Sequence, residues 1–275
     1  MPVTQDRLDW KELKADIGAE VRSSKAELLS GRYAPQLREL LEQRGVLVFP
    51  RVDFSSEEQV IFTRTLGDFV ADTPDGSAYA ITMDPSNRSA ALLKGSFFWH
   101  FDGYMNDVPI LASVMSCRVP APSGGETEFC NTYAAWDALP DGHKPQLEEM
   151  RVVHALASAQ LAVEPEPSYA TFQKWLQVPR NTLPLVWTHR SGRKSLVIGS
   201  SAVNVLDIDP LEGLELLVWL RDWATQDRFT YSHQWSAGDA VIWDNTGTLH
   251  RARPYNPASG RLMLRTKLAG EEPVA

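Results

Sequence analysis

The sequence predicts a mainly β fold with flanking helices, of the double-stranded β-helix or jelly-roll type. Segments with strand character occur in the first and last parts of the chain, and we expect the helical segments to pack on the outside of these strands. The 275 residues contain no internal repeat and no linker, and 43% of them are hydrophobic. We therefore expect one domain spanning residues 1–275, because large β-rich domains reach such sizes without splitting.

The first third of the chain predicts two helices around a buried strand. An amphipathic helix is expected over residues 34–45, and an all-apolar strand follows at 46–49. Ser55 and Glu58 form a capping-box pair, which opens a second helix running to about residue 66. Residues 68–96 are polar and rich in turn-forming residues, so we expect a loop there.

The middle of the chain is β-like and then helical. Strands are expected at residues 97–101, 110–115 and 127–130. Residues 134–180 contain helical stretches at about 134–139 and 145–159, and we expect them to form an insertion or lid over one end of the barrel. Further strands are expected at 183–188, 195–198, 240–243 and 262–268, with a helix at about 211–225.

Composition excludes several classes of protein. The net charge of −8 argues against a nucleic-acid-binding protein, since such proteins carry a basic surface. No apolar run approaches the roughly 18 residues of a membrane span. Residues 1–20 lack the features of a signal peptide, and we interpret Cys117 and Cys130 as packing residues. These observations predict a reduced, cytoplasmic setting.

Three residues have the composition of a metal site. His100 and Asp102 form a His-x-Asp pair, and His250 lies far along the chain. Two imidazoles and one carboxylate are the ligands of mononuclear non-haem Fe(II) oxygenases, where they leave about three coordination positions open. A His-x-Asp pair alone is weak evidence. The remaining histidines are interpreted as packing or surface residues; they are His143, His154, His189 and His233.

The segment after His250 strengthens this hypothesis. Strand periodicity of two places Arg261, Met263 and Arg265 on one face. If that face points inward, each guanidinium needs an anion, because an unpaired buried charge is costly. The alternative is that the opposite face is buried and both arginines are solvated. The pattern alone leaves both orientations open.

Several longer motifs resemble the taurine dioxygenase family of Fe(II)/2-oxoglutarate-dependent oxygenases. The matching stretches begin at Trp99 (WHFDG), Pro122 (PSGGETE) and Gly238 (GDAVIWDN). The stretches SLVIG from Ser195 and HQWSAGD from His233 are most similar to the branch that cleaves phenoxypropionates. The resemblance covers nearly the whole chain, from residue 45 to residue 270, in the order found in the family.

This resemblance implies a role for each site residue. His100, Asp102 and His250 would bind Fe(II). Arg261, eleven positions after His250, would bind the far carboxylate of 2-oxoglutarate together with Thr127. Arg265, fifteen positions after His250, corresponds to an arginine that binds a substrate sulfonate or carboxylate in several members. Phe98, Phe101 and Tyr104 would line an apolar substrate pocket beside Arg265.

The implied reaction is hydroxylation of a C–H bond in a small organic substrate, with Fe(II), 2-oxoglutarate and O2 as cofactor and cosubstrates. The substrate would be an anion with an apolar body, such as an aryloxyalkanoate, an alkyl sulfate or a sulfonate, and the coproducts would be succinate and CO2. Desaturation or another oxidation in a biosynthetic pathway remains an alternative. A metal-dependent hydrolase using zinc and a silent jelly-roll binding module are more remote ones. No nucleic acid or membrane partner is expected, and a homo-oligomer is left open.

Overall fold

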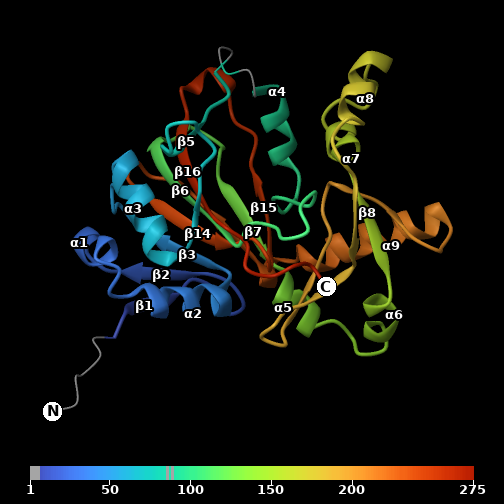
Figure 1. Cartoon of the computed structure of the whole chain (residues 1–275), viewed down its shortest axis with the longest axis horizontal. Coiled ribbons are helices and arrows are strands. Elements are labelled where there is room, and N and C mark those ends of the chain that lie inside the picture. Colours follow the sequence, from blue (N-terminus) through green and yellow to red (C-terminus); the bar gives the residue numbers. More distant parts are fainter. Residues whose placement is uncertain (1–6, 85–86, 88–89) are drawn as a thin grey trace.

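Two sheets face each other across a shared interior and form a double-stranded β-helix, which confirms the predicted fold class (Figure 1). The computed structural model describes residues 7–84, 87 and 90–275. The larger sheet has eight strands, in the order β1 (Asp9–Glu12), β2 (Ala19–Arg22), β3 (Val46–Phe49), β14 (Ala240–Asp244), β6 (Ala112–Val119), β16 (Leu262–Leu268) and β4 (Phe69–Val70), with β5 (Tyr79–Ile81) also paired to β16. The smaller sheet is β13 (Thr230–His233), β7 (Thr127–Asn131) and β15 (Thr248–Ala252).

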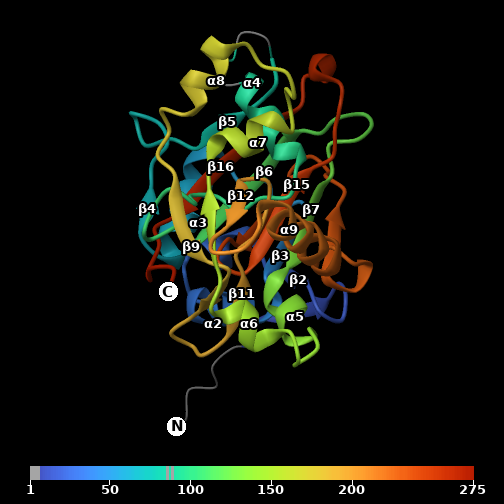
Figure 2. The same ribbon diagram turned by 90° about the vertical axis from the view of Figure 1, so that its right-hand side faces the viewer.

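Helices and two further sheets flank this sandwich. The helices are α1 (Lys25–Leu29), α2 (Ala34–Arg44), α3 (Ser56–Leu66), α4 (Ala90–Leu93), α5 (Thr132–Asp137), α6 (Lys144–Glu148), α7 (Leu156–Leu161), α8 (Tyr169–Trp175) and α9 (Pro210–Ala224), with short 3-10 turns at η1 (Lys94–Phe97), η2 (Asp227–Phe229) and η3 (Pro257–Ser259). The additional sheets are β12 (Ala202–Val205) with β8 (Arg151–His154) and β9 (Asn181–Pro184), and β10 (Val186–Thr188) with β11 (Lys194–Leu196). In Figure 2 the side of the molecule that carries these two additional sheets faces the viewer.

Helices α2 and α3 cover the outer face of the large sheet, on the left of Figure 1. The capping box at Ser55 and Glu58 and the left-handed Gly45 that ends α2 both form as predicted. Strand β14 is buried along its whole length because each of its faces has a cover. Ile242 packs outward against the helices, whereas Trp243 packs into the interior. The sandwich therefore has an apolar layer outside the large sheet and another between the sheets.

Strand β16 decides the orientation that the sequence left open. Met263 is fully buried in the interior layer, together with Trp243. Arg261 and Arg265 share the face of Met263, so both arginines point into the sandwich. Leu268, on the opposite phase, packs in the layer under α2 and α3.

Some predicted elements are wrong. Residues 97–101 do not form a strand, because a 3-10 turn ends there (Phe98 N–H to Gly95 O, 3.2 Å) and only His100 then bridges to β15. The helix predicted at 145–159 is interrupted by β8, where Val152 and Val153 pair with both β9 and β12. The segment predicted as a loop at 68–96 contains β4, β5 and α4, and its residues 85–86 and 88–89 lie outside the described part. The insertion at 134–180 stays a prediction.

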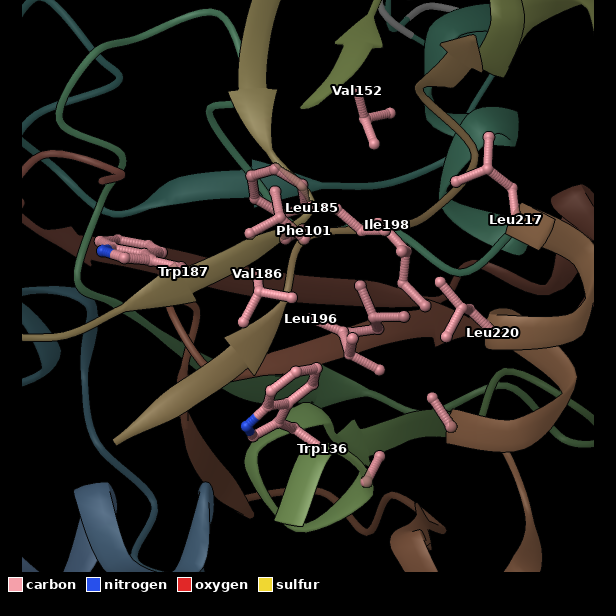
Figure 3. Packing of buried hydrophobic residues seen from close by; sticks show 14 of the residues in the cluster. Phe101, Trp136, Val152, Leu185, Val186, Trp187, Leu196, Ile198, Leu217 and Leu220 are labelled. Atoms are coloured by element: carbon pink, nitrogen blue, oxygen red, sulfur yellow. The ribbon is translucent and has the colours of Figure 1, made fainter. Parts of the chain in front are cut away.

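A second apolar core lies beside the sandwich, between α5, α9 and the two additional sheets (Figure 3). Figure 3 shows Leu196 and Ile198 on the side that faces Leu217 and Leu220 of α9, with Leu185 beside Phe101. This core also holds Phe101, which follows the first predicted metal ligand. Among the described helices, none is long and apolar enough to cross a membrane.

The burial of His154 makes the stability of the folded protein depend on pH. This residue is fully buried, with its ring near those of Phe101 and Tyr104, and burial lowers the pKa of His154 to about 4. Because this value lies below the ordinary value of about 6.5, the stability is present above about pH 6.5 and is lost as the pH falls through about 4. Between about pH 7.5 and about pH 4.5 we expect the free energy of unfolding of His154→Gln to fall by about 2–3 kcal/mol less than that of wild type. Urea unfolding at both pH values measures this difference. An unchanged loss would contradict this expectation.

Candidate metal and cosubstrate site

His100, Asp102 and His250 meet at one point of the interior. Their ligand atoms all lie within 4.8 Å of one another. His100 Nε2 is 3.7 Å from one carboxylate oxygen of Asp102, and His250 Nε2 is 3.9 Å from the other. Two nitrogen atoms and one carboxylate converging in this way are the donor set of a non-haem iron site. The three residues therefore fit a metal ion with one protein carboxylate.

Backbone pairing holds the two histidines together. His100 N–H donates to His250 O (3.1 Å), and His250 N–H donates to His100 O (2.8 Å). This isolated antiparallel bridge joins a loop residue to β15, and it brings the ring centroids to 4.1 Å. Trp243 supports the second ring, with its centroid 4.8 Å from that of His250.

The protonation states suit a metal ligand. His100 Nδ1 donates to Phe98 O (2.8 Å), which leaves Nε2 as the ring nitrogen on the side of Asp102. Burial and the neighbouring His100 lower the pKa of His250 to about 3, which keeps this ring neutral. Burial alone would raise the pKa of Asp102, but Arg265 and the two histidines outweigh it and hold the pKa at about 2. The Asp102 carboxylate is thus charged and the His250 ring is neutral, as metal ligands need to be.

Asn245 clamps the backbone of Asp102. Its side-chain oxygen accepts from Asp102 N–H (2.8 Å), and its amide donates to Asp102 O (2.9 Å) and to Ile110 O (3.1 Å). Asn245 is only 2% exposed. The WDN stretch of the sequence contains this residue, but its role appears only when the loop at 102–110 folds against the end of β14. Asn245 therefore positions the carboxylate ligand.

We expect Asn245→Ala to weaken metal binding by roughly 10–100-fold, as is typical when a group that orients a ligand is lost. Titration of the apoprotein with Mn²⁺, followed by electron paramagnetic resonance, measures this affinity. Asn245→Asp should bind as weakly, because a carboxylate cannot donate to the carbonyl groups of Asp102 and Ile110. Wild-type affinity in both variants would show that Asn245 does not position Asp102.

Arg261 is buried and only partly satisfied. It is 4% exposed, donates to Gly125 O (3.1 Å) and lies over the Tyr255 ring, 4.7 Å from its centroid. Its Nε has no hydrogen-bond partner among the described residues. Burial lowers the pKa of Arg261, which reflects the cost of holding this cation away from water. An incoming anion would recover part of that cost.

The glycines at 124 and 125 let the chain approach this arginine closely. Both have positive φ, at 68° and 77°. A Cβ at Gly124 would lie 2.3 Å from Pro254 O, and one at Gly125 would lie 3.1 Å from Arg261 Nε. Only glycine fits both the conformation and the space.

Thr127 lies beside this arginine with its hydroxyl oriented. Trp235 Nε1–H donates to Thr127 Oγ1 (2.9 Å), so the hydroxyl keeps its own proton for another acceptor. Thr127 is 4% exposed and lines the same cavity as Arg261 and the two histidine ligands. An anion bound by Arg261 would thus meet a second donor.

Arg265 has partners that the sequence did not reveal. Its guanidinium lies 3.3 Å from Asp102 and 3.4 Å from Asp72, and Lys267 also pairs with Asp72. The anion that an inward guanidinium needs is therefore already supplied to Arg265 by two protein carboxylates, before any substrate binds. Its Nε remains buried without a hydrogen-bond partner among the described residues.

The aromatic residues predicted to line the substrate pocket lie elsewhere. Phe101 and Tyr104 are buried in the second core, as Figure 3 shows for Phe101. Phe98 lines a larger cleft of about 740 Å³ under α9, which contains none of the three metal-site residues. The chain leaves the sandwich here instead of continuing as a strand, so the expected alternation does not apply.

The cavity at the metal site is smaller, about 70 Å³. We consider it the functional one, because it contains His100, His250 and Arg261, whereas the larger cleft lies on the outer side of β7 and β15. Part of its apolar wall comes from residues 68–96, which the sequence predicted as loop, and from residues 252 and 255, which it left unassigned, whereas Met115 and Trp243 come from predicted strands. The apolar side chains that line it are Ile81, Met83, Leu93, Met115, Trp243, Ala252 and Tyr255.

Comparisons with known proteins agree with this geometry. The family model described as "Taurine catabolism dioxygenase TauD, TfdA family" matches residues 9–267. The α-ketoglutarate-dependent 2,4-dichlorophenoxyacetate dioxygenase of Cupriavidus pinatubonensis is 35% identical, over 87% of this chain and 89% of that protein. The (S)-phenoxypropionate/α-ketoglutarate dioxygenase of Sphingobium herbicidovorans is 31% identical, over 96% and 95%.

A solved structure extends the likeness to three dimensions. The crystal structure of AAD-2 in complex with Mn(II) and N-oxalylglycine superposes with a TM-score of 0.83 at 29% identity, covering 98% of this chain and 100% of that one. The resemblance predicted from the motifs is confirmed. This chain belongs to the TauD/TfdA family of dioxygenases.

Proposed function

We propose that this protein is an Fe(II)- and 2-oxoglutarate-dependent dioxygenase that hydroxylates a C–H bond of a small organic anion with an apolar body. One observation carries the proposal: His100, His250, Thr127 and Arg261 line a single cavity, with Asp102 beside it. A metal-dependent hydrolase needs the ligands but has no use for the buried arginine and the oriented threonine. A silent binding module would need neither the metal ligands nor the buried arginine and threonine.

The residues divide the work between metal and cosubstrate. His100, Asp102 and His250 would hold Fe(II), and Arg261 with Thr127 would bind the far carboxylate of 2-oxoglutarate through charge-assisted hydrogen bonds. When bound, iron and 2-oxoglutarate supply the oxygen chemistry: one atom of O2 enters the substrate and the other enters succinate, with release of CO2. The apolar wall of the cavity would exclude water from the reacting C–H bond.

Both relatives described above are named for aryloxyalkanoates, which are carboxylates with an aromatic body. The substrate class proposed here follows them, with alkyl sulfates and sulfonates as the other candidates. Arg265 would contact the anionic head group, since it lines the cavity and has an unpaired Nε. Cys117 and Cys130 are buried free thiols, which fits a cytoplasmic enzyme. Association into a homo-oligomer stays a prediction.

Succinate formation tests the proposal. The purified protein with Fe(II), ascorbate, 2-oxoglutarate and O2 is assayed against aryloxyalkanoates, alkyl sulfates and sulfonates, each beside a neutral analogue such as its methyl ester. We expect at least one anion to raise succinate formation above the background without substrate, and to yield a hydroxylated product or its breakdown fragments. A protein that binds Fe(II) but consumes no 2-oxoglutarate with any compound would overturn the proposed function.

A further inference from the structure

Charged residues lie along one face of β16 and at the residue just before it, at positions 261, 265 and 267. Arg261 stands at the cosubstrate end, whereas Arg265 and Lys267 stand at the other end with Asp72 between them. Strand pairing explains the position of Asp72. Val70 of β4 pairs with Lys267 in antiparallel register, so a residue two positions after Val70 comes beside Arg265.

Asp72 is shared between two cations. One of its oxygens contacts Lys267 Nζ, and the other is 3.4 Å from Arg265 Nη2. Asp72 as a whole residue is exposed, but the paired side chains are partly shielded, with side-chain exposures of 23% for Asp72 and Arg265 and 16% for Lys267. At such partly shielded positions a surplus charge favours an opposite charge nearby, and water screens part of this interaction.

A count of charges gives the surplus. Among the described residues, the carboxylates paired with Arg265 and Lys267 are Asp72 and Asp102. Asp102 belongs to the metal ligand set, so its charge compensates the metal. Two cations and one carboxylate then remain, which leaves one positive charge beside the cavity.

We propose that Asp72 is a specificity-determining residue, which sets the charge of the substrate anchor so that the site takes a singly charged head group. A carboxylate, sulfonate or sulfate ester neutralises the one remaining charge, whereas a doubly charged phosphate ester overshoots it and is repelled by Asp72. This inference rests on the proposed function and adds the number of charges that the substrate carries.

Two single variants change this charge in opposite directions, and a double variant restores it. Asp72→Asn raises the anchor charge by one, and Lys267→Gln lowers it by one. The double variant Asp72→Asn/Lys267→Gln restores the wild-type count with nearly the same shape. Asp227→Asn serves as the matched control, because Asp227 is exposed, pairs with Lys14 and is not among the residues that line the cavity.

The measurement compares phenoxyacetate with phenyl phosphate, which share an aromatic body and carry one and two charges at about pH 8. Calorimetric titration of the anaerobic protein, loaded with Mn²⁺ and 2-oxoglutarate, gives both affinities. We expect wild type to prefer phenoxyacetate, and Asp72→Asn to shift the affinity ratio toward phenyl phosphate roughly tenfold. Lys267→Gln should weaken both ligands, the double variant should return the ratio to within about twofold of wild type, and Asp227→Asn should leave it unchanged.

An unchanged ratio in Asp72→Asn, a double variant that fails to restore it, or an equal shift in Asp227→Asn would each overturn the role of Asp72. A wild-type protein that binds 2-oxoglutarate but not phenoxyacetate would also overturn the proposed role of Asp72. The proposed dioxygenase function would survive that result. If the wild-type protein did not bind 2-oxoglutarate, the proposed function itself would be rejected. If Asp72→Asn does not fold, the weaker binding of both ligands expected of Lys267→Gln still tests the anchor charge, and unchanged affinities in that variant would overturn the inference.

Discussion

Replacing His100, Asp102 or His250 with alanine is expected to abolish Fe(II)-dependent succinate formation. Each residue supplies one of three ligand atoms that lie within 4.8 Å of one another. Loss of one leaves two ligands, and we expect metal affinity to fall more than ~100-fold, beyond the range typical for groups that only orient a ligand. Metal titration and succinate assays measure both effects.

The fold should survive these changes. Circular dichroism and thermal unfolding without metal would report whether it does. His143→Ala is the matched control, because His143 is exposed, lies outside the metal cluster and contacts Trp219. This variant should retain wild-type turnover. Substantial activity of any one alanine variant, without an added small-molecule ligand, would exclude that residue from the metal site.

Arg261→Ala is expected to raise the apparent KM for 2-oxoglutarate far more than the KM for the prime substrate. Removal of one partner from a buried charge pair typically costs about 3–5 kcal/mol, which corresponds to roughly two to three and a half decades in affinity. The 4% exposure of Arg261 places it in that class. Initial rates of succinate formation over a range of 2-oxoglutarate concentrations measure the effect.

Arg253→Ala provides the control for a nearby arginine. Its side chain is 51% exposed and its Nε lies 3.9 Å from Glu128, so its loss should change the KM little. If Arg261→Ala bound 2-oxoglutarate normally, the carboxylate would have to be bound by another cation, and Arg253 and Lys267 would be the next candidates.

The site was more predictable than its surroundings. His100, Asp102 and His250 are recognisable by residue type and motif, and the alternation along β16 placed Arg261 and Arg265 on one face before their direction was known. That direction depended on which face met an apolar layer. Met263 settles it by packing inside the sandwich, which is a tertiary contact that strand periodicity does not contain.

The contacts that tune the site were not predictable. The pairing of Asp72 with Arg265 and Lys267 depends on the register between β4 and β16, and β4 is a two-residue strand in a segment that reads as loop. Phe101 and Tyr104 looked like pocket residues because of their place in the sequence, but the chain turns away and buries them in the second core. The hydrophobicity of these two residues correctly indicated that they are buried, but it could not indicate which core they enter.

The most direct measurement adds 2-oxoglutarate to the anaerobic Fe(II) protein and records its visible spectrum. Chelation of ferrous iron by the keto acid gives a weak metal-to-ligand charge-transfer band. Wild type should develop this band and saturate at one equivalent per chain, Arg261→Ala should need a much higher concentration, and His250→Ala should show none. A wild-type protein that binds Fe(II) tightly and shows no band at saturating 2-oxoglutarate would contradict the assignment of this cavity as a joint iron and 2-oxoglutarate site.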